Sequence, residues 1–112
     1  MKCAEIMKRD VAFVHESERA WAAAAMMRDR NIGFLPVCDQ DGRVIGTITD
    51  RDIAIRIVAD GISSDRNVAE AMTQAVFSVH PDDDLARAEQ LMQAEHVSRI
   101  VVVDSDGVLA GV

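Results

Sequence analysis

Aromatic residues are scarce in this sequence, which has no tyrosine, one tryptophan and three phenylalanines among 112 residues. Hydrophobic residues make up 49% of the chain, so a packed core is possible, but it must be built mainly from aliphatic side chains and methionine. Blocks of one charge sign are also absent, and 28% of the residues are charged, which argues against wholesale disorder. The length fits one compact domain of about 100–150 residues.

Cysteine and long apolar runs are equally rare. Cys3 and Cys38 form no CxxC pair and have no metal-ligand spacing, and Cys38 ends an apolar run, which predicts a buried free thiol and no metal site. No run approaches the roughly 18–20 apolar residues that a membrane span needs, and no secretory hydrophobic region opens the chain. We therefore expect a cytoplasmic protein with no membrane segment.

The sequence also lacks the usual motifs of catalysis. It contains no GxGxxG or Walker loop, and no serine or cysteine has a plausible histidine and acid partner. His15 and His80 occupy equivalent places in the chain, where a structural role is expected. We expect no catalytic residues and therefore no enzyme.

The net charge is −7, and an acidic surface repels a nucleic-acid duplex. We therefore expect no nucleic-acid partner. A small nucleotide is compatible with the same charge, because one local arginine and a helix N-terminus can hold a phosphate.

An internal repeat is the main signal in the sequence. Sliding the chain on itself by 65 residues aligns residues 7–47 with residues 72–112 without a gap. Identical pairs include Met7/Met72, Val14/Val79, His15/His80, Ala23/Ala88, Met27/Met92, Asp39/Asp104, Gly42/Gly107 and Gly46/Gly111. Glycines in register over that length indicate two copies of one unit.

Each copy carries the same order of structural signals. A short β-rich stretch (11–14 or 76–79) precedes an N-cap candidate, Ser17 or Asp82, and a helical pattern of about a dozen residues. Two strands follow (34–38 and 43–48; 99–103 and 108 onward), joined by an Asp-Gly turn that predicts a hairpin. The first copy continues into a second helix near Asp50 and stops at Gly61. The predicted unit is β-α-β-β-α, an α/β (α+β) fold.

We expect residues 1–61 to form the first unit, 62–67 a linker and 68–112 the second unit. The linker is short and polar, and neither unit is large enough to be stable alone at about 50 residues. The two units should therefore pack against each other.

The order of these motifs resembles the CBS domain pair, also called a Bateman module. The similarity rests on Ala23-x-x-x-Met27, the run from Ile32 to Val37, Asp39-x-Asp41-Gly42 and Gly46-Thr47-Ile48-Thr49-Asp50-Arg51-Asp52, with most of this order repeated in the second copy. The resemblance implies tandem units packed about a pseudo-two-fold axis with clefts between them. It also implies regulatory binding of AMP, ADP, ATP, NAD or S-adenosylmethionine, and assembly into homodimers.

The second copy departs from the family pattern. The counterparts of Thr49 and Asp52 would fall just past Val112, so we expect the second unit to lack part of its last strand and its terminal helix. A natural truncation and a longer chain both remain open.

The candidate ligand site is the stretch from Gly46 to Asp52. A strand that runs into a helix start exposes backbone N–H groups, which suit a phosphate. The resemblance implies that Asp52 and Thr49 bind the ribose and that Arg51 pairs with phosphate. The alternative is that Thr49 or Asp50 caps a helix and Asp52 is a solvated carboxylate of its first turn.

Adenine would lie against Val11, Phe34, Leu35 and Pro36, although these residues also suit a core or sheet edge.

Two functions stay open at this point. One is a sensor that binds an adenosine-containing ligand, and the other is a ligand-free CBS pair that serves as a dimerisation scaffold. An apolar helix around Trp21 favours a homodimer in either case. The sequence leaves open the ligand, the regulated target and the dimer orientation.

Overall fold

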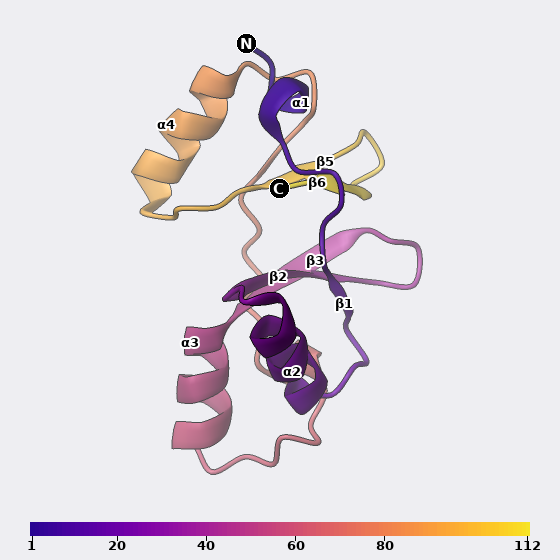
Figure 1. Ribbon diagram of the computed structural model, residues 1–112, viewed down its shortest axis with the longest axis vertical. Coiled ribbons are helices and arrows are strands. Elements are labelled where there is room, and N and C mark those ends of the chain that lie inside the picture. The colour runs from indigo at the N-terminus through magenta and orange to yellow at the C-terminus, as the bar shows by residue number, and fades with distance from the viewer.

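A computed structural model describes residues 1–112 and contains two three-stranded sheets, one from each half of the chain (Figure 1). The first half has strands β1 (Val14–His15), β2 (Phe34–Cys38) and β3 (Val44–Thr49), and helices α2 (Ala20–Arg30) and α3 (Asp50–Asp52). The second half has β4 (Ser78–Val79), β5 (Val101–Val103), β6 (Leu109–Gly111) and helix α4 (Leu85–Glu95). Short helices α1 (Cys3–Ile6) and η2 (Val68–Glu70), and the π-helical turns η1 (Ile53–Ala59), complete the chain. No helix is both long enough and apolar enough to cross a bilayer.

Both sheets have the same topology. The first strand pairs parallel to the second, across a helical crossover, and the second pairs antiparallel to the third through a hairpin. Gly42 and Gly107 each adopt a φ of 82° in the turn, where a side chain would be strained. The carboxylates of Asp39 and Asp104 stabilise these turns, because each accepts hydrogen bonds from two backbone N–H groups. The repeated α/β unit predicted from the sequence is confirmed.

The two halves are related by an approximate two-fold axis, and their hydrogen bonds occur in pairs offset by 65 residues. The Val44 N–H donates to the Gly107 carbonyl at 3.0 Å, and the Leu109 N–H donates to the Gly42 carbonyl at 3.2 Å. Thr47 and Thr73 exchange two backbone hydrogen bonds. Their counterparts Val112 and Lys8 do the same, so the halves are joined at three symmetric places.

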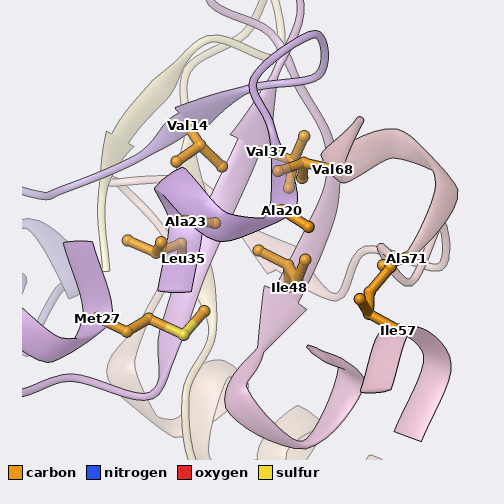
Figure 2. Close-up of a cluster of buried hydrophobic side chains, with 10 residues drawn as sticks. All are labelled: Val14, Ala20, Ala23, Met27, Leu35, Val37, Ile48, Ile57, Val68 and Ala71. Atoms are coloured by element: carbon orange, nitrogen blue, oxygen red, sulfur yellow. The ribbon is translucent and has the colours of Figure 1, made fainter. Parts of the chain in front are cut away.

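Each half lends a short segment to the core of the other. The N–H groups of Cys3 and Ala4 donate to the carbonyls of Asp83 and Pro81, so α1 lies on the second sheet, as Figure 1 shows. Symmetrically, η2 bonds to residues 16 and 18 and packs on the first sheet. Figure 2 shows the resulting first core, a cluster of Val14, Ala20, Ala23, Met27, Leu35, Val37, Ile48, Ile57, Val68 and Ala71.

The helix starts differ from the sequence prediction. The expected caps Ser17 and Asp82 are wrong by two residues, since α2 begins after Arg19 and α4 after Asp84. No side chain caps α2. Its first N–H groups donate instead to the carbonyls of Arg66 and Ser64 in the segment that links the repeats, so a distant piece of backbone replaces the local cap.

Cys38 is a buried thiol whose pKa is raised to about 11, chiefly by burial and further by the charge of Asp39. A raised pKa favours the neutral thiol in the folded state, so this contribution to stability is present in full below pH 9 and lost by about pH 11. Over that range the free energy of unfolding should fall by about 2–3 kcal/mol.

Chemical denaturation at several pH values measures this fall. The pH dependence is easier to assign because the chain has no tyrosine, whose phenol would titrate in the same pH range. The matched control is Cys38→Val, which copies Val103 from the equivalent position in the second repeat. In this variant the free energy of unfolding should fall much less between pH 9 and pH 11. If it falls as steeply as in the wild type, the assignment to Cys38 is wrong.

Candidate functional site

A cleft of about 490 Å³ lies between the two halves, a volume suited to a small organic ligand. Its lining includes residues of α3 and of the connection between α4 and β5, both of which lie on the left in Figure 1. The first half contributes Gly33, Phe34, Thr47, Thr49, Asp50, Arg51 and Asp52. The second half contributes Thr73, Ala75, Phe77, His96, Val97, Ser98, Arg99 and Val101.

Thr49 and Asp52 form a capping box where β3 runs into α3. The Thr49 hydroxyl accepts the Asp52 N–H at 3.1 Å, and Oδ2 of Asp52 accepts the Thr49 N–H at 3.0 Å. The capping role considered as the alternative for Thr49 is therefore present. Oδ1 of Asp52 makes no hydrogen bond within the chain, so the carboxylate keeps acceptor capacity on the cleft wall.

The backbone N–H groups of this turn are all used within the chain. Asp50 donates to the Gly33 carbonyl, Arg51 to Oδ1 of Asp50, and Ile53 to the Asp50 carbonyl. The expectation that the strand-to-helix turn offers free N–H groups for a phosphate is wrong, because its own acidic side chains and a neighbouring carbonyl occupy them. An anion in this cleft must rely on side chains.

The residues expected around adenine are divided among three environments. Phe34 is half-buried and lines the cleft. Leu35 and Pro36 are completely buried, and Leu35 belongs to the first core. Val11 lines a different depression, together with Arg9 and Phe13. Of the seven proposed ligand residues, the structure brings Phe34, Thr49, Arg51 and Asp52 together.

Residues 71–77 form a wall that sequence reasoning missed. The Thr47–Thr73 hydrogen bonds hold this segment against β3, and the Arg56 guanidinium donates to the carbonyls of Ala71 and Met72. Arg99 and Ser98 complete the same wall. The repeat offset could have revealed these two, because they are the counterparts of Phe34 and Gly33 in the first unit.

The charges of the cleft are unevenly distributed. Arg51 and Arg99 are both exposed, and neither guanidinium forms a hydrogen bond or ion pair within the chain. The two carboxylates, Asp50 and Asp52, lie only on the wall from the first half, where each accepts a backbone N–H. No group of three or more histidine, cysteine, aspartate or glutamate side chains is arranged to hold a metal ion.

A family model for the CBS domain matches residues 3–59 and 68–112. Hypoxic response protein 1 of Mycobacterium tuberculosis is 39% identical over 110 residues, covering 96% of this chain and 76% of that protein. A crystal structure of Hypoxic Response Protein I with two coordinated zinc ions has a TM-score of 0.89 at 31% identity, over 99% of this chain and 90% of the other.

The CBS domain pair of protein MJ0100, solved with 5'-methylthioadenosine and S-adenosyl-L-methionine, has a TM-score of 0.87 at 26% identity. That superposition covers 99% of this chain and 86% of the other. The family matches span nearly the whole sequence, and the two symmetric sheets repeat the architecture of these neighbours. The chain therefore belongs to the CBS domain family, as a tandem pair of CBS domains.

Proposed function

We propose that this chain is a non-catalytic regulatory module that binds an adenosine-containing ligand in the cleft between its two CBS units. The observation that carries the proposal is a cleft of nucleotide size whose wall holds Asp52 with one carboxylate oxygen free. A carboxylate acceptor suits the two hydroxyls of a ribose, and the half-buried ring of Phe34 suits a base. The related CBS pair of MJ0100, which was solved with two adenosine compounds, supports the same ligand class.

Regulation follows from the position of the cleft. Both halves line it, and the hydrogen-bonded segment around Thr73, which forms part of its wall, joins them. A ligand that contacts both walls favours the arrangement of the units in which it fits best, and so biases whatever partner reads that arrangement. The module needs no chemistry of its own for this role.

Isothermal titration with AMP, ATP, NAD and S-adenosylmethionine tests the proposal. At least one should bind, and Asp52→Ala should weaken that binding about 10- to 100-fold, because a charged acceptor to two hydroxyls is lost. The same substitution removes half of the capping box and should lower the free energy of unfolding by about 1 kcal/mol.

A matched control separates the two effects of Asp52→Ala. Asp84 caps α4 outside the cleft by accepting the Ala86 N–H, so Asp84→Ala should cost similar stability but leave ligand affinity unchanged. Equal affinity in the wild type and Asp52→Ala would place the ribose elsewhere. Failure of every adenosine compound to bind would overturn the proposed function.

A ligand-free dimerisation scaffold is the second candidate, and an exposed apolar surface favours it. Trp21 is 53% exposed and Val58 is 71% exposed, and between α2 and η1 they border a groove lined mainly by alanine and isoleucine side chains. We propose that a second copy of the chain covers this surface, which is compatible with either function.

Analytical ultracentrifugation at tens of micromolar should show twice the monomer mass. Trp21→Asp should shift the protein towards the monomer, because it buries a charge in the proposed interface. Phe13→Asp, at another exposed aromatic residue outside this groove, serves as the control and should remain dimeric. A wild-type monomer would exclude this assembly.

A further inference from the structure

We propose that Arg56 is a positioning residue of the ligand cleft, which holds the wall from the second unit in place relative to the wall that carries Asp52. Arg56 does not itself line the cleft. The inference rests on the proposed function and deepens it, because it names a residue outside the cleft that prepares the cleft for its ligand.

The guanidinium group of Arg56 binds the end of the short helix η2. Its Nη1 atom donates to the carbonyl oxygen of Ala71 at 3.2 Å and to that of Met72 at 3.0 Å. No backbone N–H group donates to either oxygen. The last carbonyls of a helix have no partner within the helix, so the guanidinium supplies donors that the local backbone does not provide.

The segment that Arg56 holds continues directly into the cleft wall. Thr73, the next residue, exchanges two backbone hydrogen bonds with Thr47 of β3, at 2.8 and 3.0 Å. Thr73, Ala75 and Phe77 then line the cleft. Ala71 is completely buried in the first core, so the chain passes from core to cleft within a few residues. The contacts at the start of this segment therefore determine the course of the wall.

Both walls of the cleft are attached to one helical run. Asp52 lies in α3, at the start of the run, on the wall from the first half. Arg56 follows about one helical turn later, in η1. The neighbouring Ile57 is 2% exposed and belongs to the same core cluster as Ala71, which keeps the run in place (Figure 2). One packed element thus determines where both walls lie, and Arg56 connects it to the second wall.

The position of the wall affects affinity through the cost of ordering the site. A cleft whose walls already have the spacing of the bound state binds more tightly than a cleft whose walls must first be fixed. The guanidinium of Arg56 makes no other hydrogen bond and no ion pair within the chain. Loss of its two bonds to the segment is therefore the main effect of removing it.

Arg56→Met tests the inference, because methionine keeps an apolar stem of similar length but donates no hydrogen bond. Titration with AMP, ATP, NAD and S-adenosylmethionine identifies the compound that the wild type binds most tightly. Arg56→Met should bind that compound about five- to tenfold more weakly. Arg56→Lys should recover part of the affinity, since an ammonium group can still donate to a carbonyl.

Hydrogen exchange without ligand gives a readout that does not depend on the titration. The N–H group of Thr73 should exchange faster in Arg56→Met than in the wild type, because the segment that precedes it is no longer held.

The matched control is Arg43→Met, which removes the same charge and another bond from a guanidinium to a carbonyl of the second unit. Nε of Arg43 donates to the Asp106 carbonyl at 3.1 Å, between the hairpin turns and outside the cleft. The control should bind the same compound within about twofold of the wild type.

Three results would overturn the inference and leave the proposed function standing. They are wild-type affinity in Arg56→Met, an equal loss of affinity in Arg43→Met, and unchanged exchange at Thr73. If no adenosine compound binds the wild type, the proposed function fails and the inference fails with it.

Discussion

Replacing Gly46 with alanine should lower the free energy of unfolding by about 2–3 kcal/mol, because the new methyl group has no room. A Cβ atom at this buried position would lie 2.6 Å from the sulfur of Met72 and 2.9 Å from the carbonyl oxygen of Thr73. The sulfur is flexible, but the Thr73 carbonyl accepts the Thr47 N–H and cannot retreat without breaking one of the bonds that join the two units. Equilibrium denaturation in urea measures the loss.

A second substitution separates the two clashes. Gly46→Ala combined with Met72→Ala removes the sulfur contact but keeps the carbonyl contact, so the combined loss should be smaller than the sum of the single losses and still substantial. Gly111 is the symmetric counterpart, with Lys8 and Met7 in the same places, and Gly111→Ala should behave alike. If both glycine variants are as stable as the wild type, the hydrogen-bonded segments that join the two units can shift to make room for a methyl group, and the prediction is wrong.

Introducing a carboxylate at Cys3 should cost about 4 kcal/mol and should destabilise the second unit first. Cys3 is 3% exposed, belongs to the second core with Val79, Ala88, Ile100 and Val102, and lies beside Asp83 and Asp84. Cys3→Asp would bury a charge without a partner, next to two like charges. Hydrogen exchange should show loss of protection in residues 77–112 before residues 11–60.

Ile6→Asp is the matched control for this prediction. It adds the same carboxylate to the same short helix, but Ile6 is 55% exposed, so the new charge stays solvated and the loss should be under about 1 kcal/mol. Cys3→Val, which copies Val68 from the equivalent position, should be tolerated. If protection falls first in the first unit, the placement of α1 on the second sheet is wrong.

The sequence predicted the repeated unit well because its signals are local. The Asp-Gly turns, the apolar strand from Phe34 to Cys38 and the 65-residue offset all lie within one unit, and the strand has the bounds that were expected. The cap predicted at Ser17 failed because it depends on long-range contacts. Nothing local to Ser17 shows that carbonyls of residues 64 and 66 cap α2.

The candidate site shows the same division. Thr49, Arg51 and Asp52 could be placed together because they occupy one turn, and both the capping role and the exposure of Asp52 were considered. Leu35 was expected at the ligand because apolar residues suit adenine as well as a core, and alternation along β2 turns its side chain into the core. The wall from Thr73 to Arg99 was missed because it belongs to the other repeat, and only the symmetry relation brings it to the cleft.

The exchange of α1 and η2 between the units also sets an order of events during synthesis. Residues 1–8 are synthesised before the rest of these 112 residues, yet Cys3 bonds to Asp84 across 81 positions of sequence and Lys8 pairs with Val112. The first unit can close once residues 68–71 have emerged, whereas the second must wait until residue 112 is available to pair with Lys8. Such distant closure is slow, because the loop entropy is lost before any contact compensates for it. Residues 1–8 are therefore held back as the final piece of the fold, and a substitution that weakens their docking would act on the last step of assembly.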